Sequence, residues 1–403
     1  MKAPQSLYLT LGILWGVFFV GFSVRMAVII TIPLIREDLQ ISFSQVGLLL
    51  SITSMAYGLI QFPAGILTDR FNERSLLLFV TLALAVALIG ISASTDLLFL
   101  ALSLLLMGLT VGFSSPVSFS ILSKRVKRRI GTVFGIYNTA PSFAQFFGTN
   151  ISSIIAVHYN WHEVYYLWII LDLILSILIW RFIAGHDETP LPRTIHKITF
   201  STLLSDKAVI AFLITFIAHS VCAFSALTMN PLYLVEIHEL DVTVTATIYG
   251  ATRLVGFIGS FLGGYLSDRM AKVQLLLLSL TITAVSIYLF AVLPFSPLLI
   301  AIMGIQAISI NVFFPIIYAV IFQLTPPTIR GKAQGLYNSV AFTIGGLAPF
   351  IMGIITDESS FTLAFMFPPL VAGIGIFWLL FLMKKGYSER LAPISFNNAS
   401  QAD

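Results

Sequence analysis

The chain has 403 residues, of which 58% are hydrophobic and only 10% are charged. Soluble globular domains carry roughly 25% charged residues, and a water-soluble protein of this length lacks the interior volume to hide so many apolar side chains. Composition therefore excludes an ordinary soluble protein and predicts a membrane protein. The net charge of +4 gives no reason to expect a nucleic-acid partner, and the single cysteine excludes an internal disulfide and a cysteine-based metal cluster.

Apolar runs of the length needed to cross a bilayer, about 20 residues, follow one another along the whole chain. A cleavable signal peptide over 12–24 is disfavoured, because no small-residue cleavage site follows it. The sequence thus predicts an all-α integral membrane protein with twelve transmembrane helices. The predicted spans are 8–35, 44–66, 75–93, 97–122, 131–157, 163–184, 208–235, 243–266, 273–292, 297–324, 333–355 and 361–383.

The positions of lysine and arginine predict how these spans are oriented. If the N-terminus is cytoplasmic, 19 of the 22 basic residues fall in cytoplasmic loops and tails, and only Arg36 falls in an external loop. Basic residues favour the cytoplasmic side of a membrane. We therefore expect a multi-pass protein of the cell (inner or plasma) membrane with both termini in the cytoplasm. The two remaining basic residues, Arg25 and Arg253, lie inside spans.

Sequence motifs recur at an offset of about 200 residues. The segment 131–139 matches 331–339, the segment 65–71 matches 264–270, and Pro116 and Pro315 lie 199 apart. An even number of spans per copy gives a parallel repeat about the membrane normal. We therefore predict two pseudo-symmetric six-helix bundles. The predicted divisions are an N-terminal half 1–184, a cytoplasmic linker 185–207, a C-terminal half 208–384 and a cytoplasmic tail 385–403.

The repeated loop segment, GILTDRFNER at 65–74 with its partner at 264–272, resembles the G-x-L-x-D-R-x-G-R-R/K signature of the major facilitator superfamily. The resemblance covers the whole chain, and it implies a secondary transporter in which this loop acts as a conformational gate. Asn72 stands where the family usually has glycine, which predicts a looser first copy. A simpler interpretation is that the loop arginines only enforce topology. The predicted gate residues are Asp69, Arg70, Arg74, Asp268 and Arg269.

Arg25 and Arg253 are the main candidates for substrate binding. Each lies about ten residues from the outer end of its span, which places it roughly 15 Å deep at 1.5 Å per residue. A mid-bilayer arginine costs about 2.5–3.5 kcal/mol on insertion scales, so it is a functional hypothesis by default. In the family, spans one and eight line the central cavity, where two guanidinium groups suit a bidentate anion. The alternative is that each arginine snorkels or pairs with a helix carbonyl or an acid.

Other polar residues complete the predicted site. His219 lies one turn before Ala223, the repeat counterpart of Arg25, so we predict that it faces the cavity. A histidine there could bind an anion or carry a proton, or it could be structural. Asp172 is the one acid at mid-span, and either proton coupling or helix–helix contact is open for it. Polar faces on spans two and five add Ser54, Tyr57 and Gln145.

These observations predict a secondary transporter for a small anion, an organic carboxylate, driven by a proton gradient or by exchange. We expect a monomer in the lipid bilayer with no cofactor and no metal. One alternative is an exporter of drugs or other hydrophobic compounds with structural arginines, which is disfavoured because Leu104 replaces the arginine that drug–proton antiporters usually carry. The other is a non-transporting receptor or scaffold. An enzyme is disfavoured because no nucleophile–base pair appears. The predicted binding residues are Arg25, Arg253, His219, Gln145, Tyr57 and Ser54.

Overall fold

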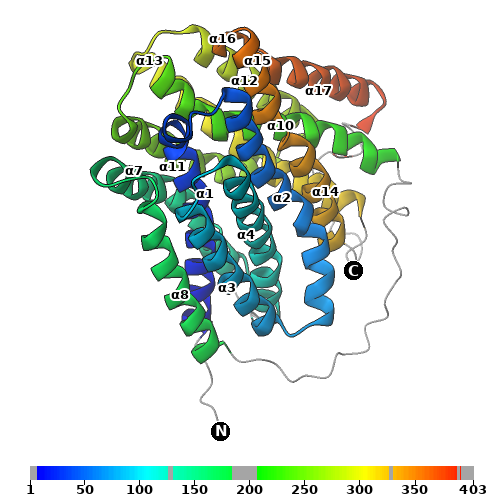
Figure 1. Cartoon of the computed structure of the whole chain (residues 1–403). Coiled ribbons are helices and arrows are strands. Elements are labelled where there is room, and N and C mark those ends of the chain that lie inside the picture. The colour runs from blue at the N-terminus through cyan, green and yellow to red at the C-terminus, as the bar shows by residue number, and fades with distance from the viewer. Residues whose placement is uncertain (1–6, 126–129, 184–206, 326–329, 388–390, 392–403) are drawn as a thin grey trace.

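The computed structural model describes residues 7–125, 130–183, 207–325, 330–387 and 391, and every regular element in these ranges is a helix (Figure 1). Eleven helical segments of the described chain are long and apolar enough to cross a membrane. The predicted all-helical, multi-span fold is confirmed. The predicted linker 185–207 lies almost entirely outside the described residues, and so does most of the predicted tail 385–403.

The first bundle consists of the helices up to residue 182. Its spans are α1 (Leu7–Leu39), α2 (Phe43–Arg70), α3 (Glu73–Ser92), α4 (Leu97–Arg125), a broken fifth span, and α8 (Val164–Phe182). Ser42 caps the start of α2 in a complete capping box with Gln45, which satisfies two backbone N–H groups at the helix end. Within this bundle α2 packs on α4, α3 packs on α4 and α8, and α1 packs on α8.

The second bundle repeats this plan from residue 207. Its spans are α10 (Lys207–Glu236), α11 (Val242–Ser267), α12 (Lys272–Val292), α13 (Pro297–Leu324), α14 (Arg330–Gly345) with α15 (Ala348–Glu358), and α16 (Phe361–Ala364) with α17 (Phe367–Lys384). Here α11 packs on α13, α12 packs on α13, and α10 packs on α17. In Figure 1 the blue helix α2 runs beside the orange helix α14, where the two bundles meet.

The fifth span differs from the continuous helix that we predicted over 131–157. It is divided into α5 (Ile130–Tyr137), α6 (Ala140–Phe143), a π-helical turn η1 (Ala144–Gly148) and α7 (Thr149–His158). Pro141 stands at the start of α6, where a residue without an N–H interrupts the preceding helix. Single π-helical turns inside helices often occur at functional sites. Because its pieces are short, this span is the one that is absent from the eleven long apolar segments.

The bundles meet along two pairs of spans. α2 packs on both α14 and α15, and α11 packs on α7 and η1, while α1 contacts α10. By the repeat, α2 is the counterpart of α11, and the α14–α15 span is the counterpart of the fifth span, so the pseudo-symmetry relates the two interfaces to each other. Arg25 of α1 and Arg253 of α11 lie on helices that contact each other and that both contact α10.

One end of the molecule is closed by contacts between the bundles. We call it the opposite side, because it faces away from the basic side that carries Arg70, Lys124 and Arg181 at the ends of α2, α4 and α8. On the opposite side Arg36 pairs with Glu236 at 3.0 Å. The carboxylate of Asp357 accepts the backbone N–H groups of Phe43 at 2.9 Å and Ser44 at 2.7 Å.

Close backbone approach reinforces this closure. A Cβ added at Gly47 of α2 would collide with the carbonyl oxygen of Pro349, and one added at Gly353 would collide with that of Phe43. Only glycine allows helices to approach this closely. By contrast, the glycines of the repeated loop motif, Gly65 and Gly264, have nothing within 4 Å of an added Cβ. The described contacts thus hold the bundles together on the opposite side and leave the motif glycines unpacked on the basic side.

Candidate functional site

Arg25 lies in the middle of α1 and is buried, with 3% of its surface exposed. Its guanidinium carbon is 4.4 Å from the ring centroid of Tyr57, 5.5 Å from that of Phe22 and 5.9 Å from that of Phe224. The first two rings belong to the same bundle and the third belongs to α10. Its Nε has no hydrogen-bond partner among the described residues. Arg25 is therefore held by aromatic faces, which attract a cation but do not neutralise its charge.

Arg253 lies in α11 of the other bundle and is 4% exposed. Its Nη2 donates a hydrogen bond of 2.6 Å to the carbonyl oxygen of Ala226 in α10. Its guanidinium carbon is 5.0 Å from the ring centroid of Tyr249, one turn earlier on the same helix. A backbone carbonyl thus orients one edge of this guanidinium, and its charge has no ionic partner among the described residues.

Tyr249 lies near both arginines, and the sequence explains why it is fixed. Pro231 in α10 has no N–H, so the carbonyl of Leu227, four residues earlier, lacks its helical partner. The Tyr249 hydroxyl donates to that carbonyl at 2.6 Å. The same side chain lies against Arg253 and also near Arg25. We call Arg25, Arg253, Tyr57 and Tyr249 the arginine–tyrosine site.

The arginine–tyrosine site has no acidic partner in the part of the chain that the structure describes. Within the described ranges the ion pairs are Arg36–Glu236 and Lys124–Glu73, and neither includes Arg25 or Arg253. Buried charges are normally paired, because an unpaired one leaves a large desolvation cost uncompensated. The site therefore combines two buried positive charges from opposite bundles. A bound anion would compensate these charges.

The remaining predicted binding residues lie in different surroundings. Gln145 is in the π-helical turn η1, half-buried, with its Nε2 3.2 Å from the carbonyl oxygen of Pro141. The backbone carbonyl of Gln145 faces Gly250 of α11, which places this turn at the bundle interface. Ser54 is buried where α2 packs against Gly346, which lies between α14 and α15. It therefore belongs to the packed interface between the bundles. Of the polar face predicted on span two, Tyr57 is the member that contacts an arginine.

The two candidates for proton coupling lie apart from each other. His219 is fully buried in α10 and stacks on Phe313 of α13, with ring centroids 3.7 Å apart, and both of its ring nitrogens lack a hydrogen-bond partner in the described chain. Asp172 is buried in α8, which packs on α1 and α3, and its Oδ2 also lacks a described partner. Neither residue contacts Arg25 or Arg253 through a described ion pair. Their roles stay predictions.

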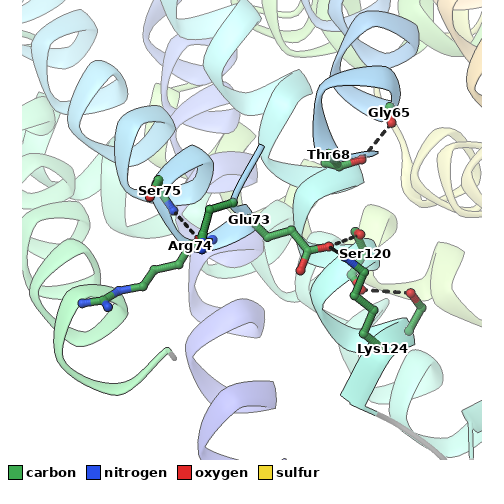
Figure 2. Close-up of polar contacts among 9 residues, drawn as sticks. Gly65, Thr68, Glu73, Arg74, Ser75, Ser120 and Lys124 are labelled. Carbon is green, nitrogen blue, oxygen red and sulfur yellow. Dashed lines mark hydrogen bonds and ion pairs between the residues drawn. The ribbon is translucent and has the colours of Figure 1, made fainter. Parts of the chain in front are cut away.

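The predicted gate residues make contacts within their own bundles. Figure 2 shows Glu73 at the start of α3 reaching Ser120 and Lys124 of α4, with 2.8 Å between Glu73 Oε1 and Lys124 Nζ. Arg74 points the other way (Figure 2) and donates to the backbone carbonyl of Trp180 in α8. Glu73, the first residue of α3, is not among the gate residues that the sequence predicted.

The other predicted gate residues are exposed, or their side chains lie outside the described residues. Asn72 caps α3, because its Oδ1 accepts the N–H groups of Arg74 at 3.0 Å and Ser75 at 3.3 Å. Arg70 and Asp268 are exposed, and the side chain of Asp69 is outside the described residues. Arg269, just beyond the end of α11, donates to the hydroxyl of Tyr265 in α11. A gating role for this set stays a prediction.

Comparison with known proteins identifies the class. The family model of the Major Facilitator Superfamily matches residues 13–293 and 254–399. The chain belongs to this superfamily of transporters, and it is not an enzyme.

The chain is similar to individual transporters of known name and to solved structures. A hexuronate transporter of Bacillus subtilis (strain 168) is 27% identical over 402 residues, covering 93% of this chain and 92% of that protein. A probable sulfoacetate transporter of Cupriavidus necator is 23% identical, with 94% of each protein covered. A crystal structure of a bacterial homologue of the human lysosomal transporter Spinster, in an inward-facing and occupied conformation, superimposes with a TM-score of 0.79 at 15% identity, covering 95% of this chain and 98% of that one. The superposition shows the shared fold.

Proposed function

We propose that this transporter moves a small organic carboxylate and that the arginine–tyrosine site binds its carboxylate group. The observation that carries the proposal is the pair of buried guanidinium groups, one from each bundle, that have no acidic partner in the described chain. An anion between them would compensate two charges that otherwise remain uncompensated in a low-dielectric region. Two similar proteins carry names that specify organic anions, hexuronate and sulfoacetate.

Tyr57 and Tyr249 supply the rest of the proposed pocket. Their rings lie against Arg25 and Arg253 respectively and keep water away from the guanidinium faces. The planar N–H edges are then available for bidentate hydrogen bonds to a carboxylate, a geometry for which arginine is better suited than lysine. Because the two arginines come from different bundles, a bound anion would couple the bundles to each other.

We also propose that the basic side is cytoplasmic. The loops of that side carry most of the lysine and arginine, and such loops favour the cytoplasm. With this orientation, the ion pair of Arg36 with Glu236 and the bonds of Asp357 close the outer side. Substrate would then reach the site from the cytoplasmic side in the conformation described, and rocking of the bundles would expose it to the other side.

The test is uptake of a labelled hexuronate by proteoliposomes that contain the purified protein. We expect the Arg253→Ala variant to reduce uptake at least about tenfold, since it removes a charge-assisted contact worth roughly 1.5–3 kcal/mol. Arg181→Ala is the matched control, because Arg181 is an exposed arginine at the end of α8 and should transport as the parent does. Equal uptake by the parent and Arg253→Ala would contradict the proposal and favour structural arginines in an exporter of hydrophobic compounds. Absence of flux for a broad anion panel would favour a receptor or scaffold.

A further inference from the structure

Two amide side chains in the second bundle are paired with each other but not fully satisfied. Asn230 of α10 and Gln306 of α13 have no exposed surface, and Asn230 Nδ2 donates to Gln306 Oε1 at 2.8 Å. Asn230 Oδ1 and Gln306 Nε2 are buried without a partner among the described residues. Turning both amides over exchanges their roles but still leaves one acceptor and one donor group unused. Buried polar groups are almost always hydrogen-bonded, so this pair requires an explanation.

A second amide pair shows what a completed arrangement looks like in this protein. Asn338 Nδ2 donates to Gln61 Oε1 at 3.1 Å, between the two bundles, and Asn338 Oδ1 accepts the hydroxyl of Tyr318 at 3.0 Å. No atom of this pair is among the buried unsatisfied groups. The fold therefore satisfies one amide pair with a third side chain. In the Asn230–Gln306 pair, one donor and one acceptor stay without a partner among the described residues.

The unsatisfied pair lies next to the arginine–tyrosine site. Asn230 is one helical turn, about 5.4 Å, beyond Ala226, whose carbonyl accepts Arg253. Gln306 precedes Ala307, whose carbonyl oxygen would lie 3.1 Å from a Cβ added at Gly256, three residues after Arg253. The pair therefore lies at about the depth of Arg253 in the same bundle.

We propose that the Asn230–Gln306 pair recognises a hydroxyl group of the substrate and so selects hydroxylated carboxylates, the class to which sugar acids belong. A hydroxyl is at once a donor and an acceptor, so it can donate to the free amide oxygen and accept from the free amide N–H. This inference rests on the proposed function, because it assigns a second contact to the same substrate. The pair has no exposed surface here, and Pro231, next to Asn230, is the point at which α10 can bend to open it.

The test compares two six-carbon monocarboxylates, gluconate and hexanoate, by equilibrium binding to the purified full-length protein. Gluconate carries hydroxyls along its chain and hexanoate carries none. We expect Gln306→Met, which keeps the side-chain length but removes the amide, to weaken gluconate binding about tenfold, or about 1.4 kcal/mol, and to change hexanoate binding less than about twofold. Asn230→Leu is the second variant and should show the same selective loss if Gln306→Met folds poorly.

Gln61→Met is the matched control, because it removes an amide from the satisfied pair. It should change the affinities for the two ligands by the same factor. Equal effects of Gln306→Met and Asn230→Leu on both ligands would overturn the proposed hydroxyl contact while leaving the arginine–tyrosine site in place. If the parent protein binds neither anion, the proposed function itself fails, and the hydroxyl contact fails with it.

Discussion

At the residue scale, a purely structural role for Arg25 and the proposed anion-binding role predict opposite effects on stability. Its three aromatic neighbours retain some favourable cation–π energy, about 0.5–2 kcal/mol. An unpaired charge in the middle of a span costs about 2.5–3.5 kcal/mol even on insertion scales. An arginine kept only for structure should stabilise the protein, whereas one kept for an anion should destabilise the ligand-free state.

This contrast gives a prediction about the sign of a stability change. We expect Arg25→Met to raise the melting temperature of the ligand-free protein by a few degrees, because it removes an uncompensated buried charge and keeps an apolar stem. The same variant should lose the stabilisation that a bound carboxylate gives the parent protein. Thermal unfolding in detergent, with and without the anion, measures both effects. A lower melting temperature for ligand-free Arg25→Met would indicate a structural arginine.

Tyr249 gives a second prediction at this scale. We expect Tyr249→Phe to destabilise the protein by about 1–3 kcal/mol, because it leaves the Leu227 carbonyl, which has no helical partner before Pro231, unsatisfied. Tyr288→Phe is the control, since the side chain of Tyr288 on α12 is exposed. Chemical or thermal unfolding measures the difference. Similar stability of the two variants would contradict the role given to Tyr249.

The sequence predicted some residues of the site better than others. Arg25 and Arg253 stand out in any sequence, because a charge inside an apolar span is rare and costly. The part played by Tyr249 depends on a carbonyl in another helix, so no pattern within its own span identifies it, although it lies one turn from Arg253. For His219, helical spacing predicted the cavity face, but spacing cannot tell which neighbour covers a face, and here Phe313 stacks on the ring.

At the element scale, the closure of the opposite side depends on the start of α2. Asp357 of α15 accepts two backbone N–H groups there, across the boundary between the bundles, where a carboxylate is also favoured by the helix dipole. The close approach at Gly47 allows these bonds to form. The loop ends of α2 and α15 thus act together in holding the bundles closed.

We expect Asp357→Ala to lower the free energy of opening the opposite side by about 1 kcal/mol. The variant removes the exposed carboxylate and with it two hydrogen bonds. Spin labels at Leu98 and Leu298, which are exposed at the starts of α4 and α13, should report longer distances between the bundles. The one cysteine, Cys222, is buried, which favours selective labelling. Asp241→Ala is the control, since Asp241 caps α11 within one bundle. An unchanged distance distribution in Asp357→Ala would contradict this role.

The sequence predicted most helices because apolar length and the internal repeat both report on membrane crossing. It missed the division of the fifth span, whose interruptions are local. Pro141 was visible as a helix breaker, but the π-helical turn after it contains Ala144, Gln145, Phe146, Phe147 and Gly148, a composition that also suits a regular helix. The turn depends on packing against Gly250 of α11, which only the assembled bundles provide.

At the scale of the whole molecule, the proposed arginine–tyrosine site predicts exchange as the mode of transport. An empty site would carry two uncompensated charges through the change of access, whereas an occupied site carries fewer. We therefore expect unlabelled substrate inside proteoliposomes to accelerate uptake of labelled substrate several-fold. Counterflow at equal pH on both sides measures this effect. Equal rates with loaded and empty vesicles would contradict obligatory exchange and favour coupling through Asp172 or His219.

Equilibrium titration of the purified protein with a hexuronate tests whether two arginines from opposite bundles bind one anion together. We expect one bound anion per chain in the parent protein. We also expect binding to weaken at least about tenfold in Arg25→Met and in Arg253→Met, because each variant lacks one of the two guanidinium contacts. Binding of parental affinity in both variants would show that the arginines do not hold the anion.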